Sequence, residues 1–148
     1  MTWQILDQEY EQAKIAVIGI GGGGGNMVNH MINSGIRGVD FICANTDSQD
    51  LSKIHKAKLI KLGNDQTRGQ GAGNNPLQGK LAAELSLDEI EACLKNTEMV
   101  FITAGMGGGT GTGAAPVIAK LAKEMGILTI GVVTTPFKYE KQKRAEQA

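Results

Sequence analysis

Short apolar runs separated by longer mixed segments dominate the hydrophobic pattern of this chain. Four continuous runs are typical of strands buried inside a parallel sheet. They predict strands at residues 14–18, 39–44, 98–103 and 127–133. Between them, apolar residues recur at helical spacing, most clearly over residues 27–32 and 117–125. This alternation predicts an α/β fold, a doubly wound parallel sheet with right-handed crossovers.

Local signals predict where several helices begin and end. Gly35 and Gly126 follow the two amphipathic stretches and predict their C-terminal ends. Residues 79–85 predict a short helix, and Ser86 with Glu89 forms a capping-box pattern for the next one. The segment 48–76 has weak periodicity apart from residues 59–62 and is interpreted as a long loop, of a kind that is commonly functional or mobile.

Glycine is concentrated in two segments that each join a predicted strand to a predicted helix. The chain has 21 glycines, and they cluster in residues 19–25 and 105–113. Within these two segments most glycines are consecutive or alternate with threonine. We expect two loops, with the second helix opening near Pro116, because proline is well tolerated in a first helical turn. Glycine lets the backbone approach another molecule closely, and the N–H groups of such loops bind phosphate. The pattern therefore predicts an anion site.

Polar residues follow the other strands at the same end of the predicted sheet. Asn45, Thr46 and Asp47 follow the second strand, and residues 134–137 follow the fourth. Ligands of open α/β sheets bind in the crevice outside the carboxyl ends of the strands. One nucleotide could therefore touch both glycine segments and these residues.

Composition narrows the classes of function. The 148 residues carry 15 basic and 15 acidic side chains, and this balance argues against nucleic acid as a partner. Cys43 and Cys93 lie in apolar contexts without metal-ligand spacing, so they are interpreted as buried thiols and no metal site is predicted. No leader or apolar run near 18 residues is found, which predicts a soluble protein. Residues 1–13 are interpreted as a polar extension and residues 14–148 as part of one nucleotide-binding domain.

Two kinds of nucleotide remain possible from the pattern. Gly19, Gly21 and Gly24 satisfy G-x-G-x-x-G after a strand, and Asp47 lies where an NAD(P)-binding Rossmann domain of an oxidoreductase keeps its ribose-binding acid. However, consecutive glycines match almost any glycine spacing. A second glycine segment exceeds the needs of one pyrophosphate, so a purine triphosphate fits better.

Several motifs together resemble the FtsZ family of bacterial cell-division GTPases, within the tubulin superfamily. The resemblance lies in residues 21–26, 45–47, 71–76 and 136–144, and above all in the GGGTGTG run at 107–113. It implies a Rossmann-like GTPase domain that binds GTP or GDP with Mg²⁺ accompanying the nucleotide. The nucleotide-binding residues that it implies are Gly22, Gly23, Gly24, Gly25, Asn26, Asn45, Ala72, Gly73, Gly108, Gly109, Thr110, Gly111, Thr112, Gly113, Pro136, Glu140 and Arg144.

The resemblance also implies partners, location and a division of labour. It implies a cytoplasmic protein at the division site that assembles head to tail with itself, without nucleic acid or membrane insertion. The chain would end less than half way through a typical member. The acidic catalytic loop, which acts on the adjacent subunit, would then lie beyond Ala148. So would the C-terminal regions that bind other cell-division proteins. We therefore expect weak nucleotide binding and little GTPase activity from these residues alone. Asn74 departs from the family pattern, which has a small apolar residue there.

Overall fold

The computed structural model describes residues 12–63, 69–140 and 142–148. Its centre is a five-stranded parallel sheet of β1 (Ile15–Ile20), β2 (Asp40–Asn45), β3 (Lys58–Lys61), β4 (Met99–Gly105) and β5 (Leu128–Thr134). The spatial order is β3-β2-β1-β4-β5. The chain therefore winds outward in both directions from β1, which confirms the predicted doubly wound α/β sheet. Most of the predicted N-terminal extension, residues 1–11, lies outside the described residues.

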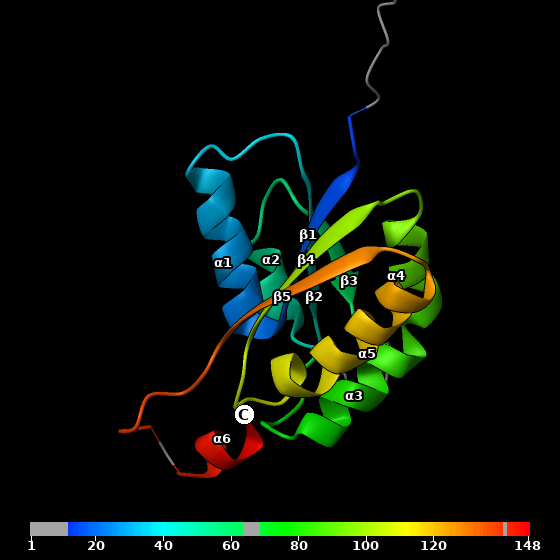
Figure 1. Cartoon of the computed structure of the whole chain (residues 1–148). Coiled ribbons are helices and arrows are strands. Elements are labelled where there is room, and N and C mark those ends of the chain that lie inside the picture. Colours follow the sequence, from blue (N-terminus) through cyan, green and yellow to red (C-terminus); the bar gives the residue numbers. More distant parts are fainter. Residues whose placement is uncertain (1–11, 64–68, 141) are drawn as a thin grey trace, which may run out of the picture.

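Helices cover both faces of the sheet (Figure 1). On one face, α1 (Gly21–Asn33) and α2 (Ser48–Ser52) enclose a small apolar cluster that includes Val28 and Cys43. On the other face, α3 (Pro76–Leu85), α4 (Leu87–Leu94) and α5 (Thr110–Glu124) pack over a larger core. The short α6 (Gln142–Gln147) lies near the carboxyl ends of the strands. None of the helices in the described ranges has both the length and the apolar character that crossing a membrane requires.

Two elements in the predicted long loop were missed. The segment 48–76 contains α2 and the edge strand β3, so the sheet has five strands and not four. In β3 only Ile60 is buried, because an edge strand needs few apolar residues to pack. The fourth predicted strand, β5, is also an edge strand, and Leu128, Val132 and Val133 remain exposed despite their apolar sequence.

Both glycine segments are more helical than predicted. The helix α1 begins at Gly21, directly after β1, and α5 begins at Thr110, so Pro116 lies inside that helix and not in its first turn. Close packing explains why glycine is needed there. A Cβ on Gly24 would collide with the carbonyl oxygen of Thr103 in β4, and one on Gly113 would collide with the carbonyl oxygen of Pro76 in α3. The glycines thus let the first turns of α1 and α5 approach their neighbours closely.

The predicted helix ends are partly right. Gly35 and Gly126 follow the ends of α1 and α5 with φ of +78° and +77°, as predicted for glycine after a helix. Ser86 is the N-cap residue of α4 as predicted. The predicted capping box does not form, because Ser86 Oγ accepts a hydrogen bond from the Gly63 N–H at 3.1 Å instead of capping α4. Cys43 is buried as predicted, whereas Cys93 is only partly buried.

Candidate nucleotide site

The N-termini of α1 and α5 open onto one cleft at the carboxyl ends of the strands. Neither helix has a side-chain cap or an acidic residue in its first turn, as judged over the described residues. The contrast with α2 and α3 is direct, because Asp47 caps the first and Asn75 caps the second. Uncapped first-turn N–H groups and the positive ends of two helix dipoles favour an anion. Backbone geometry therefore makes the cleft suited to a phosphate chain.

The cleft has a volume of about 550 Å³ and draws its lining from four parts of the chain. Two are the starts of α1 and α5. The others are the end of β2 with α2, and the loop before α3. Arg144 of α6 completes the rim. The lining residues are Ile20, Gly21, Gly22, Gly23, Asn45, Thr46, Asp47, Asp50, Gln70, Gly71, Gly73, Asn74, Gly105, Gly108, Gly109, Thr110, Gly111 and Arg144.

The turn between β4 and α5 is held by its own side chains. Gly107 has φ of +97°, a conformation that favours glycine, and its N–H donates to Thr112 Oγ1 at 2.8 Å. A Cβ on Gly107 would lie 2.6 Å from both Pro136 Cγ and the Arg144 carbonyl oxygen. The segment after β5 therefore packs on this turn and brings Arg144 to the rim.

Buried polar side chains form the floor of the cleft beside β2. Thr46 is fully buried, and its hydroxyl oxygen lies 2.6 Å from that of Thr110 at the start of α5. Asn45 is 5% exposed, and its Oδ1 accepts from the Asp47 N–H at 3.2 Å. These contacts orient the end of β2 toward the first turn of α5.

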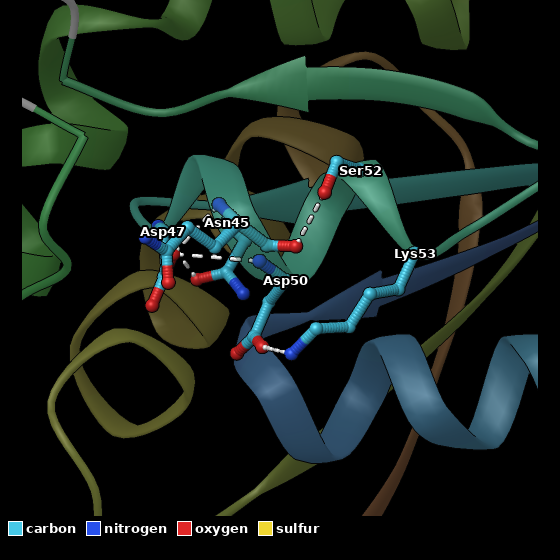
Figure 2. A network of polar contacts seen from close by, with 6 residues as sticks. Asn45, Asp47, Asp50, Ser52 and Lys53 are labelled. Atoms are coloured by element: carbon cyan, nitrogen blue, oxygen red, sulfur yellow. Dashed lines mark hydrogen bonds and ion pairs between the residues drawn. The ribbon is translucent and has the colours of Figure 1, made fainter.

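Two carboxylates lie beside this floor, as Figure 2 shows. Asp47 Oδ1 accepts from the Gln49 and Asp50 N–H groups at 2.8 and 3.4 Å. Asp50 accepts from Lys53 Nζ at 2.8 Å, and this hydrogen bond raises the pKa of Lys53. Each carboxylate thus already has a partner, and one of the two negative charges is balanced by a lysine.

The cleft residues offer oxygen ligands that fit a magnesium ion arriving with a nucleotide. No cluster of three or more His, Cys, Asp or Glu side chains suited to a metal occurs in the described part of the chain. Mg²⁺ is typically held by one or two carboxylates together with phosphates and water. Asp47, Asp50 and the Asn45 amide supply such oxygens next to the helix N-termini.

Nine of the seventeen predicted site residues line the cleft together. They are Gly22, Gly23, Asn45, Gly73, Gly108, Gly109, Thr110, Gly111 and Arg144. Gly25 and Asn26 instead line an adjoining cavity of about 170 Å³ between α1 and α2.

The remaining six predicted residues lie outside the cleft lining, and most have an identifiable packing or bonding role. Gly24 and Gly113 permit close packing, Ala72 is buried behind Gly109, and Thr112 accepts from the turn. Pro136 packs on Gly107. Glu140 accepts from Arg144 at 3.2 Å and from the Phe137 N–H at 3.3 Å. It also lines a neighbouring hollow of about 620 Å³ together with the cleft residues Asn74 and Arg144.

The prediction also missed residues that line the cleft. Thr46 and Asp47 were noted as crevice residues but not assigned to the site, whereas Asp50 and Gln70 were not considered. Gln70 reaches the cleft through a β-bridge with Asp47. A polar residue directly after a buried strand was a usable signal for Thr46, but no local pattern identified Gln70.

Comparison with known proteins identifies the family. A model of the Tubulin/FtsZ family, GTPase domain, matches residues 14–148. The cell division protein FtsZ of Pseudomonas putida is 55% identical over 146 residues, which are 99% of this chain and 37% of that protein. FtsZ of Coxiella burnetii is 56% identical over 138 residues, which are 93% of this chain and 36% of that protein.

A solved structure described as an empty FtsZ dimer from M. jannaschii agrees with the fold. Its TM-score is 0.91 at 46% identity, covering 95% of this chain and 41% of that one. The chain spans a little over a third of the length of the curated relatives it matches. The comparisons do not favour the alternative of an NAD(P)-binding domain. The fold, the glycine segments and these matches together show that the chain belongs to the Tubulin/FtsZ family, in its GTPase domain, and is homologous to FtsZ cell division proteins.

Proposed function

We propose that this chain is the phosphate-binding part of a self-assembling GTPase of bacterial cell division, and that the cleft holds the phosphates of GTP or GDP. One observation supports this most strongly. Two helix N-termini without side-chain caps converge on a cleft lined by glycine backbone. Relatives that carry the name cell division protein FtsZ support the cellular role, and an FtsZ dimer among the similar structures supports self-association.

Each part of the site has a distinct role in the proposal. The N–H groups at Gly22, Gly23 and Gly108 to Gly111 donate to phosphate oxygens. Arg144 pairs with phosphate and is oriented by Glu140. Asn45, Asp47 and Asp50 would hold the Mg²⁺ that accompanies the nucleotide, which would supply neutralisation of phosphate charge. Positioning and charge neutralisation supply most of the catalysis in phosphoryl transfer.

The proposal assigns hydrolysis to an assembly of subunits. Water must be oriented for attack on the terminal phosphate. Asp47 and Asp50, the carboxylates of the cleft, already have a capping and an ion-pair role. We infer that an acidic loop of an adjacent subunit supplies the water-orienting group. The 148 residues alone would bind guanine nucleotide weakly, form no filaments and release little phosphate. The protein would act in the cytoplasm, at the division site.

The experiment uses one glycine of the cleft and one elsewhere. Gly108→Val adds a side chain toward the cleft, where a Cβ would lie 3.8 Å from Asn74 Oδ1 and meet nothing closer. Gly131→Val is the matched control, because a Cβ there meets nothing within 4 Å and the residue lies in β5. We expect GTP and GDP, but not NAD or ATP, to raise the thermal midpoint of the parent chain and of Gly131→Val, and Gly108→Val to lose the effect.

Other results of this experiment would contradict parts of the proposal. Equal nucleotide stabilisation of Gly108→Val would exclude this cleft as the phosphate site. Stabilisation by NAD alone would favour the dinucleotide alternative. Phosphate release by the 148 residues at a rate independent of protein concentration would contradict the shared active site. Addition of a longer chain with an intact acidic loop and a disabled nucleotide site should restore turnover.

A further inference from the structure

A row of exposed leucines runs along α3. Leu77, Leu81 and Leu85 recur every four residues and are 59%, 40% and 51% exposed. The opposite side of the helix buries Gly79, Ala82 and Ala83. Single exposed leucines are ordinary, but residues four apart on a helix are neighbours and form one continuous patch. The cleft lining includes none of the three leucines, so the nucleotide site does not account for this leucine stripe.

Two charged residues border the leucine stripe along one edge. Lys80 and Glu84 are both about half exposed, and their side chains lie 4.0 Å apart. Beyond them, Leu87, Val117 and Leu121 line a hollow of about 350 Å³ between α3 and α5. The edge carries one positive and one negative charge. A basic amphipathic helix typical of membrane surfaces would instead concentrate Lys and Arg.

We propose that the leucine stripe binds a second copy of this chain, with the two α3 helices packed antiparallel about a two-fold axis at Leu81. The spacing is self-complementary. With the axis at Leu81, Leu77 of each copy meets Leu85 of the other, and Leu81 meets its own counterpart. An interface with a two-fold axis uses the same patch on both copies, as this arrangement does.

Charge selects the antiparallel orientation. A two-fold axis perpendicular to the helices, as in the antiparallel pair, keeps the same edge of both helices on the same side. Lys80 of one copy then lies two residues, or about 3 Å along the helix, from the level of Glu84 in the other. A parallel pair about a two-fold axis along the helices would place the Lys80–Glu84 edges of the two copies on opposite sides of the interface, so these charges would not pair across it. Only the antiparallel pairing brings the leucines of the two copies into contact and also places Lys80 of one copy near Glu84 of the other.

The size of the surface sets the strength of the contact. One helix of ten residues offers less than the roughly 800 Å² per partner of a standard stable interface. We therefore expect weak association that is seen at high protein concentration and does not depend on nucleotide. Copies already aligned by another contact would use this surface at a much higher effective concentration.

Disulfide trapping tests the register. The background is Cys93→Ser, since Cys93 is partly exposed and Cys43 is buried. Leu81→Cys should form a disulfide dimer on oxidation. Leu77→Cys and Leu85→Cys should not form one separately, because like positions lie about 12 Å apart along the axis, but their mixture should. Absence of the Leu81→Cys dimer, or equal trapping by all three single variants, would overturn the proposal.

Charge exchange tests the orientation without altering the leucines. By sedimentation velocity, Lys80→Glu should weaken association at least tenfold, and the double variant Lys80→Glu with Glu84→Lys should restore it. Leu81→Lys should also weaken it tenfold, whereas Leu59→Lys, at a position 41% exposed on β3, should not. Far-ultraviolet circular dichroism checks folding. Unchanged association in Lys80→Glu, no recovery in the double variant, or binding of the monomer to anionic lipid vesicles through Leu81 would overturn it.

Discussion

The hydroxyl oxygens of Thr46 and Thr110 lie 2.6 Å apart, although 64 positions separate the two residues. Thr46 follows β2 and is fully buried, and Thr110 opens α5. The bond joins the end of one strand to the first turn of a helix that follows a different strand. It therefore fixes the floor of the cleft and the spacing of the two segments that line it.

Removal of either hydroxyl of this pair should have unequal effects on stability. Thr110→Val leaves the fully buried Thr46 hydroxyl without its partner and should lower the free energy of unfolding by about 1–3 kcal/mol. Thr46→Val leaves the Thr110 hydroxyl, which is only partly buried, and should cost less. Urea unfolding of the single variants and the double variant gives the coupling energy. Equal costs with no coupling would show that the bond does not stabilise the fold.

Substitution by alanine should lower stability at a glycine that is needed for close packing, but not at a glycine that lines the cleft. Gly113→Ala introduces a methyl group against the Pro76 carbonyl oxygen of α3, so we expect a loss of about 1–3 kcal/mol in stability. Gly108→Ala meets no atom closer than 3.8 Å and should leave stability within about 0.5 kcal/mol. Thermal and urea unfolding without ligand measure both. Equal stability of the two variants would contradict the close contact between α3 and α5.

Arg144 and Glu140 should contribute unequally to nucleotide binding. Arg144 lines the cleft, whereas Glu140 lies outside the cleft lining and accepts a hydrogen bond from Arg144. The Arg144 side chain is 53% exposed and the Glu140 side chain 29%, so solvent screens this ion pair and its effect on stability should be small. We expect Arg144→Ala to weaken GTP binding at least tenfold and Glu140→Ala to weaken it less, measured by calorimetry. Equal affinity of both variants and the parent chain would remove the two residues from the proposed site.

The two thiols should differ in reactivity because burial raises the pKa of Cys43 to about 11. At pH 8 only ~0.1% of such a thiol is ionised, and the thiolate is the reactive form. N-ethylmaleimide should modify Cys93 at least tenfold faster in the folded chain, and both cysteines equally in urea, as mass spectrometry can measure. Rapid modification of Cys43 in the folded chain would contradict its burial.

The same shift has a consequence for stability. The folded state retains the Cys43 proton to higher pH than the unfolded state, whose thiol has a pKa near 9. The contribution of this thiol to stability should therefore decrease as pH rises from about 9 to 11. The contribution of the Cys43 thiol is isolated by measuring, at each pH, the difference in unfolding free energy between the parent chain and Cys43→Ala. A difference that does not change with pH would contradict the raised pKa of Cys43.

The predictable parts of the fold were those whose signal is local. The buried strands β1, β2 and β4 are continuous apolar runs, and Gly35 and Gly126 follow helices as predicted. The edge strand β3 was missed, because the short apolar run at residues 59–62 was too weak a signal for a strand in which only Ile60 is buried. The boundaries of α1 and α5 were wrong because glycine has a low intrinsic helix propensity. Packing outweighs that propensity where Gly24 and Gly113 touch neighbouring backbone.

The sequence by itself determined the α/β class and the buried strands β1, β2 and β4. It also determined the family, through glycine segments that need a backbone free of side chains. Tertiary structure decided which residues share the cleft. It brought Gln70 and Asp50 to the lining and removed Gly24, Gly113 and Glu140 from it. A glycine needed for a ligand and one needed for close packing are identical in sequence. Only the atoms that surround each in the folded chain distinguish them.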